Sequence, residues 1–180
     1  RGKSPGRVLD ECAYLCERHG IEHIYFRNDN FFARKDQVRS FIEEKLARGL
    51  PFTWDAQLRA NYFHEGYVDD ELLASLKRAG CRKMMIGVES GSERMLAIIK
   101  KDISLDQVRL SALQARRHAI DVQYSFIFGL PDESALDLQM TVDFIRELKE
   151  INPFAHVVQF LYRPFPGSEL YNRCLQLGMK

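Results

Sequence analysis

Five short runs of aromatic and β-branched residues are spaced along the chain, and longer segments of helical periodicity separate them. The runs cover 22–26, 52–56, 83–88, 122–128 and 156–161. Each has the length and composition that are typical of a strand. Their starts recur every ~30–40 residues, the length of a strand, a helix and the connections between them. We therefore predict five strands that alternate with helices.

The segments between the runs repeat apolar residues every three or four positions, which predicts amphipathic helices. These helices are expected over 5–19, 36–48, 69–79, from Ser104 onward, over 135–150 and over about 168–177. Strands that alternate with helices pair in parallel, with the helices packed outside the sheet, so the predicted fold class is α/β. The chain opens on a helix with no strand before it. We therefore expect that the first strand of the pattern is missing.

Composition and charge narrow the class of protein. The 180 residues are 46% hydrophobic and 28% charged, which suits one globular domain over 1–180. The 26 basic and 25 acidic side chains give a net charge of +1. Bulk electrostatics therefore predict neither a nucleic-acid nor a membrane partner. No apolar run approaches the ~20 residues that a membrane-spanning helix needs.

Four cysteines are scattered along the chain, at positions 12, 16, 81 and 174. This spacing does not resemble a disulfide scaffold, and we interpret them as reduced thiols of a cytoplasmic protein. Cys12, Cys16 and His19 have the spacing of metal ligands, but they lie inside a helical pattern with no strand before it. We favour core packing over metal ligation for these thiols, and packing also for the other two cysteines.

Polar or glycine-containing segments follow all five predicted strands, at 27–30, 55–59, 89–92, 129–133 and 159–164. Taken singly, each has an ordinary structural explanation as a turn, a helix cap or a solvated loop. The carboxyl ends of parallel strands meet at one edge of a sheet or barrel, where such folds bind ligands. Together, the five segments predict a ligand site at this edge.

Two strand ends carry polar side chains that need partners. Alternation puts Asp55 and Gln57 on one face of their strand, where polar groups are costly unless they are paired or bind a ligand. Gln57 is therefore a candidate ligand-binding residue. Glu89 follows directly on an apolar run and has the same need for a partner. A lyase that uses Lys100 or Lys101 as a Schiff-base amine is disfavoured, because neither lysine lies at a strand end.

Four motifs at the strand ends, in this order, resemble those of the radical S-adenosylmethionine (SAM) superfamily. They are Ile-Tyr-Phe-Arg-Asn-Asp-Asn-Phe at 24–31, Ile-Gly-Val-Glu-Ser-Gly-Ser at 86–92, Phe-Ile-Phe-Gly-Leu-Pro at 126–131 with Glu133, and Pro-Phe-Pro-Gly-Ser-Glu-Leu-Tyr at 164–171. The sequence is most similar to the group whose members often carry a cobalamin-binding domain ahead of the barrel. The resemblance covers nearly the whole chain. It implies a partial parallel (β/α)6-type barrel in which these five strands are the second to the sixth.

The resemblance also implies which residues bind the methionine part and the ribose of SAM. Arg27, Asn28 and Asp29 match positions that contact the amino group of the methionine moiety. Glu89 and Ser90 match positions that bind the ribose or the methionine carboxylate.

The remaining implied contacts lie later in the chain. Lys101 matches a basic position that is often paired with the methionine carboxylate. Ser125 and Gly129 match positions near the ribose and the adenine, and Leu161 and Tyr162 match the strand whose backbone reads the adenine edge.

The family binds a [4Fe–4S] cluster through a Cys-x-x-x-Cys-x-x-Cys loop after the first strand, and electron transfer from the cluster cleaves SAM to a 5′-deoxyadenosyl radical. That loop would precede Arg1 and is not in this sequence. We expect that the intact protein starts radical chemistry on a small-molecule substrate, with SAM, the cluster and, where a domain for it precedes the barrel, cobalamin. The chain alone is expected to be inactive. The alternative is a non-catalytic barrel remnant that serves as a binding or scaffold module. The open edge of the first strand present is expected to promote self-association.

Overall fold

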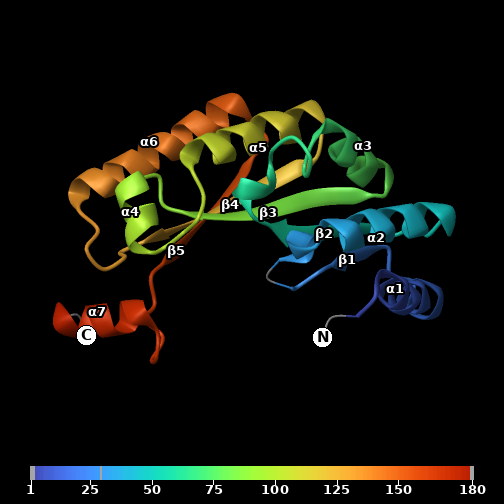
Figure 1. The fold of residues 1–180 in the computed structure, drawn as a ribbon, viewed down its shortest axis with the longest axis horizontal. Coiled ribbons are helices and arrows are strands. Elements are labelled where there is room, and N and C mark those ends of the chain that lie inside the picture. The colour runs from blue at the N-terminus through green and yellow to red at the C-terminus, as the bar shows by residue number, and fades with distance from the viewer. Residues whose placement is uncertain (1–2, 29, 179–180) are drawn as a thin grey trace.

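The computed structural model describes residues 3–28 and 30–178, and five parallel strands form its single sheet in the order β1-β2-β3-β4-β5. The strands are β1 (His23–Tyr25), β2 (Thr53–Leu58), β3 (Cys81–Glu89), β4 (Asp121–Phe128) and β5 (His156–Leu161). Figure 1 shows that the sheet curls into an arch. The arch is the partial barrel that the sequence predicted, with β1 and β5 as the two edge strands of the described sheet.

Except for the last one, the helices of the described chain cover the outer side of the arch. They are α1 (Pro5–His19), α2 (Lys35–Ala47), α3 (Asp70–Arg78), α4 (Glu93–Ile98), α5 (Leu105–Arg117), α6 (Ala135–Ile151) and α7 (Glu169–Gln176), with short 3-10 turns at η1 (Phe31–Ala33) and η2 (Ala60–Tyr62). Successive helices α1, α2, α3, α5 and α6 contact each other in that order around the outside. In Figure 1, α7 lies apart from this layer, below the end of β5. No helix in the described part of the chain is long and apolar enough to cross a membrane.

The helix boundaries follow from local capping chemistry. The hydroxyl of Ser4 accepts a hydrogen bond from the backbone of Arg7 at the start of α1, and Gly20 ends that helix with φ +65°. Ser104 and Ser134 begin α5 and α6 with complete capping boxes. These caps explain why the helix starts could be predicted closely from the sequence.

Strict alternation along the central strands separates an outer face from an inner face. The outward residues are fully buried beneath the helices: Trp54, Ala56 and Leu58 on β2, Met84, Ile86 and Val88 on β3, and Val122, Tyr124 and Phe126 on β4. Burial of each large apolar side chain stabilises the fold by ~1.5–3 kcal/mol. The inward residues are only half-buried. The core therefore lies between sheet and helices, and the inner face of the arch is open.

Three of the four cysteines are buried, and two of them, Cys12 and Cys81, belong to this core. Cys12, Cys81 and Cys174 are buried, as predicted for packing residues, and Cys16 is half-buried. Burial raises the pKa of the Cys12 thiol to about 11, so it stays protonated and unreactive at neutral pH.

The second strand is longer than the sequence suggested. We predicted a strand over 52–56, whereas β2 continues to Leu58. Ala56 and Leu58 are buried and face outward, and Gln57 between them faces inward. A polar inward residue looks like the start of a loop in the sequence, although the strand continues through it.

An aromatic cluster fixes the end of β1. Phe26, Phe31, Phe41 and Trp54 pack with ring centroids 4.8–5.8 Å apart, mostly edge to face. The buried indole of Trp54 donates to the backbone oxygen of Ala79 at 2.9 Å. The cluster anchors both ends of the polar segment that follows β1.

Candidate functional site

The carboxyl ends of the strands meet at one rim of the arch, and polar or small residues line the inner face there. Neighbouring inward positions pair across the sheet: Gln57 with Met85 on β3, and Gly87 with Ser125 on β4. A side chain from any one of these strands therefore lies beside those of the next, as the predicted ligand site requires.

Glu89 and Lys101 form an ion pair at this rim. The Nζ atom of Lys101 lies 2.8 Å from Oε1 of Glu89, and the two side chains are only 25% and 19% exposed. Glu89 has φ +72°, a conformation that non-glycine residues seldom adopt, and the pairing of β3 with β4 shifts register between Gly87 and Glu89. Such strain is held only by the surrounding structure and concentrates at functional sites.

Gly87 provides the space for this pair. A Cβ atom on residue 87 would overlap the Glu89 carboxylate and would stand 3.1 Å from Nζ of Lys101. Because Gly87 faces inward beside Ser125, the carboxylate and the ammonium group lie over the inner face of the sheet. The structure thus brings together Glu89, Lys101 and Ser125, three of the residues predicted to bind the ligand.

The segment after β1 lies at the same rim but is more exposed. Arg27 and Asn28 are solvent-exposed, and the Arg27 guanidinium stacks 5.3 Å from the ring centroid of Tyr25. The hydroxyl of Tyr25 in turn accepts a hydrogen bond from Gln57 at 3.3 Å. Tyr25 therefore connects two predicted ligand contacts, and sequence reasoning missed it. Asp29 lies outside the described residues.

The ends of β4 and β5 form the other side of the rim. Gly129 has φ +77°, and its amide donates to the carboxylate of Glu133 at 2.6 Å. Burial raises the pKa of Glu133. The backbone of Tyr162 donates to Phe128 at 2.8 Å and continues the pairing beyond β5.

Two predicted residues have side chains that do not face a ligand at this rim. Leu161 is 79% exposed, and alternation places it on the face opposite to Phe160. The role that the resemblance gives it belongs to its backbone. Ser90 is fully buried, and its hydroxyl lies 3.2 Å from that of Thr141 on α6. A direct contact between Ser90 and a ligand stays a prediction.

The residues at this rim fit the ligand SAM but do not provide ligands for an iron–sulfur cluster. Within 3–28 and 30–178, no three His, Cys, Asp or Glu side chains converge as metal ligands do. By contrast, a carboxylate and an ammonium group side by side over a glycine complement the amino and carboxylate groups of an amino acid.

Comparisons with known proteins identify the family of this chain. The model of the radical SAM superfamily matches residues 1–145. An uncharacterized methyltransferase of Pyrococcus horikoshii is 30% identical over 95% of this chain and 35% of its own length. The cytidylyl-2-hydroxyethylphosphonate methyltransferase of Streptomyces wedmorensis is 28% identical over 99% of this chain and 33% of its own length.

A solved structure shows the same fold. The radical SAM methyltransferase TsrM of Kitasatospora setae, determined with cobalamin and a [4Fe–4S] cluster bound, matches 97% of this chain and 32% of its own with a TM-score of 0.79 at 17% identity. The chain spans about a third of the length of the curated relatives that it matches. The family model covers far more than half of the chain, and the motifs at 86–92 and 126–131 lie within it. The chain therefore belongs to the radical SAM superfamily.

Proposed function

We propose that the intact protein is a radical SAM enzyme and that this chain forms the larger part of its SAM-binding barrel. The Glu89–Lys101 pair over Gly87 is the observation that carries the proposal. SAM presents an ammonium group, a carboxylate and two ribose hydroxyls. In the half-buried ion pair, the ammonium group of Lys101 can donate to the carboxylate of SAM, and the carboxylate of Glu89 can accept from its ammonium group or its hydroxyls.

The chain's own residues position the ligand. Lys101 donates to the methionine carboxylate, while Glu89 accepts from the ribose hydroxyls or the amino group. Gly87 leaves room for the Glu89 carboxylate against the backbone of β3, and Ser125 beside it offers a hydroxyl. Bound at a reduced [4Fe–4S] cluster, SAM supplies radical chemistry in this superfamily. The described residues provide no set of side chains that could hold such a cluster, so we propose that this chain binds SAM without cleaving it.

For the intact protein we propose methyl transfer to a small molecule, with cobalamin as a further cofactor. The relatives from P. horikoshii and S. wedmorensis are both named as methyltransferases, and TsrM was determined with cobalamin. The scattered, buried thiols support a cytoplasmic location for the protein. A non-catalytic binding module remains the second candidate, and it requires the same SAM site.

Calorimetric titration of the chain with SAM tests whether the chain binds SAM, which both candidate functions require. Wild-type chain should give saturable heat, and E89Q or K101M should weaken binding about tenfold or more, the effect of losing a charge-assisted contact. The matched control is E147Q, because Glu147 pairs with Arg109 on the outer helices. Absence of saturable heat in the wild-type chain would overturn the proposal.

Titration cannot separate an enzyme from a binding module, so activity decides between them. The intact protein, with its cluster reconstituted anaerobically, should release 5′-deoxyadenosine or S-adenosylhomocysteine from SAM when a reductant is supplied. Tight SAM binding without either product would favour the binding module.

A further inference from the structure

The segment 90–92, which follows Glu89, is held against α6 by side chains more than 40 positions away. The amide of Gly91 donates to the hydroxyl of Thr141 at 3.0 Å, and the Ser90 hydroxyl lies 3.2 Å from the same atom. The hydroxyl of Ser92 donates to Asp137 at 2.6 Å. Two side chains of α6 thus bond all three residues of the segment.

Packing leaves this segment no freedom to shift toward α6. A Cβ atom on Gly91 would stand 2.6 Å from the Cα of Thr141 and 2.8 Å from the Cβ of Phe144. Only a glycine allows α6 to approach so closely. The backbone of the segment therefore rests directly on the helix.

Asp137 has more partners than a helix cap requires. Its carboxylate is buried and accepts from the Ser134 backbone at 2.9 Å, which completes the cap of α6. It also accepts from Ser92 and, in a two-pronged contact, from Arg94, the second residue of α4. The guanidinium of Arg94 holds the pKa of Asp137 far below its usual range, so the carboxylate is charged at any physiological pH.

These contacts fix a strained neighbour. Glu89 precedes Ser90 directly, and its φ of +72° persists only if the adjacent backbone cannot relax. Its carboxylate must reach Lys101, which lies beyond α4 in the sequence. The contacts of Asp137 hold both the segment before α4 and the first turn of α4 itself.

We propose that Thr141 and Asp137 are positioning residues that hold the Glu89 carboxylate over the inner face of the sheet by bonding the segment 90–92 to α6. The inference rests on the proposed function, because Glu89 is taken as a SAM contact. Thr141 and Asp137 touch no ligand themselves. Their effect on binding must therefore pass through Glu89.

A double-mutant cycle on SAM affinity tests this dependence. T141V removes the hydroxyl and keeps the shape, and it should weaken SAM binding about fivefold, the effect of one lost buried hydrogen bond. In an E89Q background the same substitution should change affinity less than twofold, since the residue through which it acts is already altered. T141S, which restores the hydroxyl, should return affinity to nearly the wild-type value.

The matched control is S111A. Ser111 is also fully buried, and its hydroxyl lies 2.8 Å from that of Tyr124 between α5 and β4. S111A should lower the melting temperature as T141V does and leave SAM affinity unchanged. If T141V weakens binding equally in both backgrounds, or not at all, the inference is overturned.

Amide hydrogen exchange across 87–92 provides a readout that needs no ligand. T141V and D137N should each raise the exchange rate of this segment about tenfold relative to S111A, as local openings become more frequent. A wild-type chain that binds no SAM would refute the proposed function, and the exchange rates would then decide alone whether α6 holds this segment. Unchanged exchange in T141V would refute the positioning role.

Discussion

Gly87 and Glu89 share one site on the inner face of β3: the carboxylate of Glu89 folds back over Gly87 and occupies the volume that a side chain at 87 would need. This relationship makes a direct prediction. G87A should displace the Glu89–Lys101 pair and weaken SAM binding about tenfold or more, an effect as large as losing the pair itself. Calorimetry on the folded variant measures it.

A glycine elsewhere on the rim controls for backbone effects. Gly129 has φ +77°, but a Cβ atom there would meet nothing within 4 Å. G129A should therefore lower stability through backbone strain and disturb SAM binding less than G87A. Equal losses of affinity in the two variants would contradict the steric explanation.

Acid stability should depend on Asp137. The pKa of this carboxyl is lowered chiefly by its hydrogen bonds with Arg94, so its ionised form stabilises the fold at all pH values above its unfolded pKa of ~3.9. This contribution to stability is lost as the pH falls from the unfolded pKa of ~3.9 toward the lower pKa of the folded state. The melting temperatures of wild type and D137N should be compared between about pH 2 and 7. The difference between the two melting temperatures should be constant above pH ~5 and should shrink below pH ~4. A difference in melting temperature that does not vary with pH would show that the charge of Asp137 does not contribute to stability.

Much of the fold could be predicted from the sequence because its signals are local. Short apolar runs identified the five strands, and helical periodicity located most of the helices between them. The ligand rim followed from the rule that parallel strands bind ligands at their carboxyl ends. The family resemblance assigned Glu89 and Lys101 separately to the ligand site, whereas their ion pair with each other was not predicted.

The contacts that hold the rim in place could not be predicted. Ser90 and Thr141 lie 51 positions apart, and a buried serine after a strand looks the same in the sequence whether it binds a ligand or a helix. Asp137 could be recognised as a cap within its own helix, whereas its contact with Ser92 depends on how α6 crosses the sheet. Long-range hydrogen bonds between small polar side chains leave no periodic signal.

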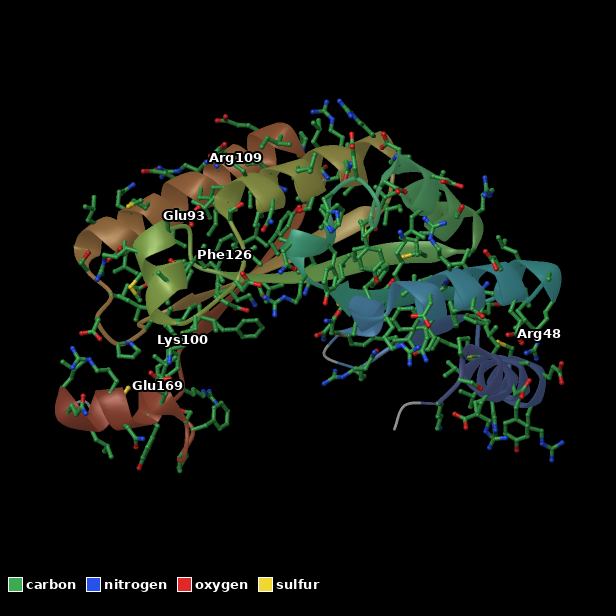
Figure 2. All side chains as sticks on the ribbon, in the orientation of Figure 1. Arg48, Glu93, Lys100, Arg109, Phe126 and Glu169 are labelled. Carbon is green, nitrogen blue, oxygen red and sulfur yellow. The ribbon has the colours of Figure 1, made fainter. Side chains whose placement is uncertain are left out.

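The last helix, α7, should detach before the rest of the fold. Two ion pairs connect it to the rim, Lys100–Glu169 and the two-pronged Arg173–Asp132, and Figure 2 shows Lys100 and Glu169 facing each other. The Lys100–Glu169 pair is mostly exposed. Exposed ion pairs contribute only ~0–1 kcal/mol to the free energy of unfolding, and they weaken as the salt concentration rises. Amide exchange in α7 should therefore quicken between low and high salt while exchange in β3 stays slow. Equal salt dependence in both elements would contradict this weak attachment.

The free edge of β1 should cause self-association at high concentration. Glu22 and Phe26 bond to β2 through their backbone, so in a parallel ladder the intervening His23 and Tyr25 direct their N–H and C=O groups to the open edge. Sedimentation velocity should show oligomers that grow with concentration. H23P removes one edge donor without removing a backbone hydrogen bond to β2, and it should shift the distribution toward monomer. H23A controls for the loss of the imidazole contacts with Thr53 and Asp55. A wild-type chain that stays monomeric, or an H23P variant that associates as H23A does, would show that the edge is not the contact.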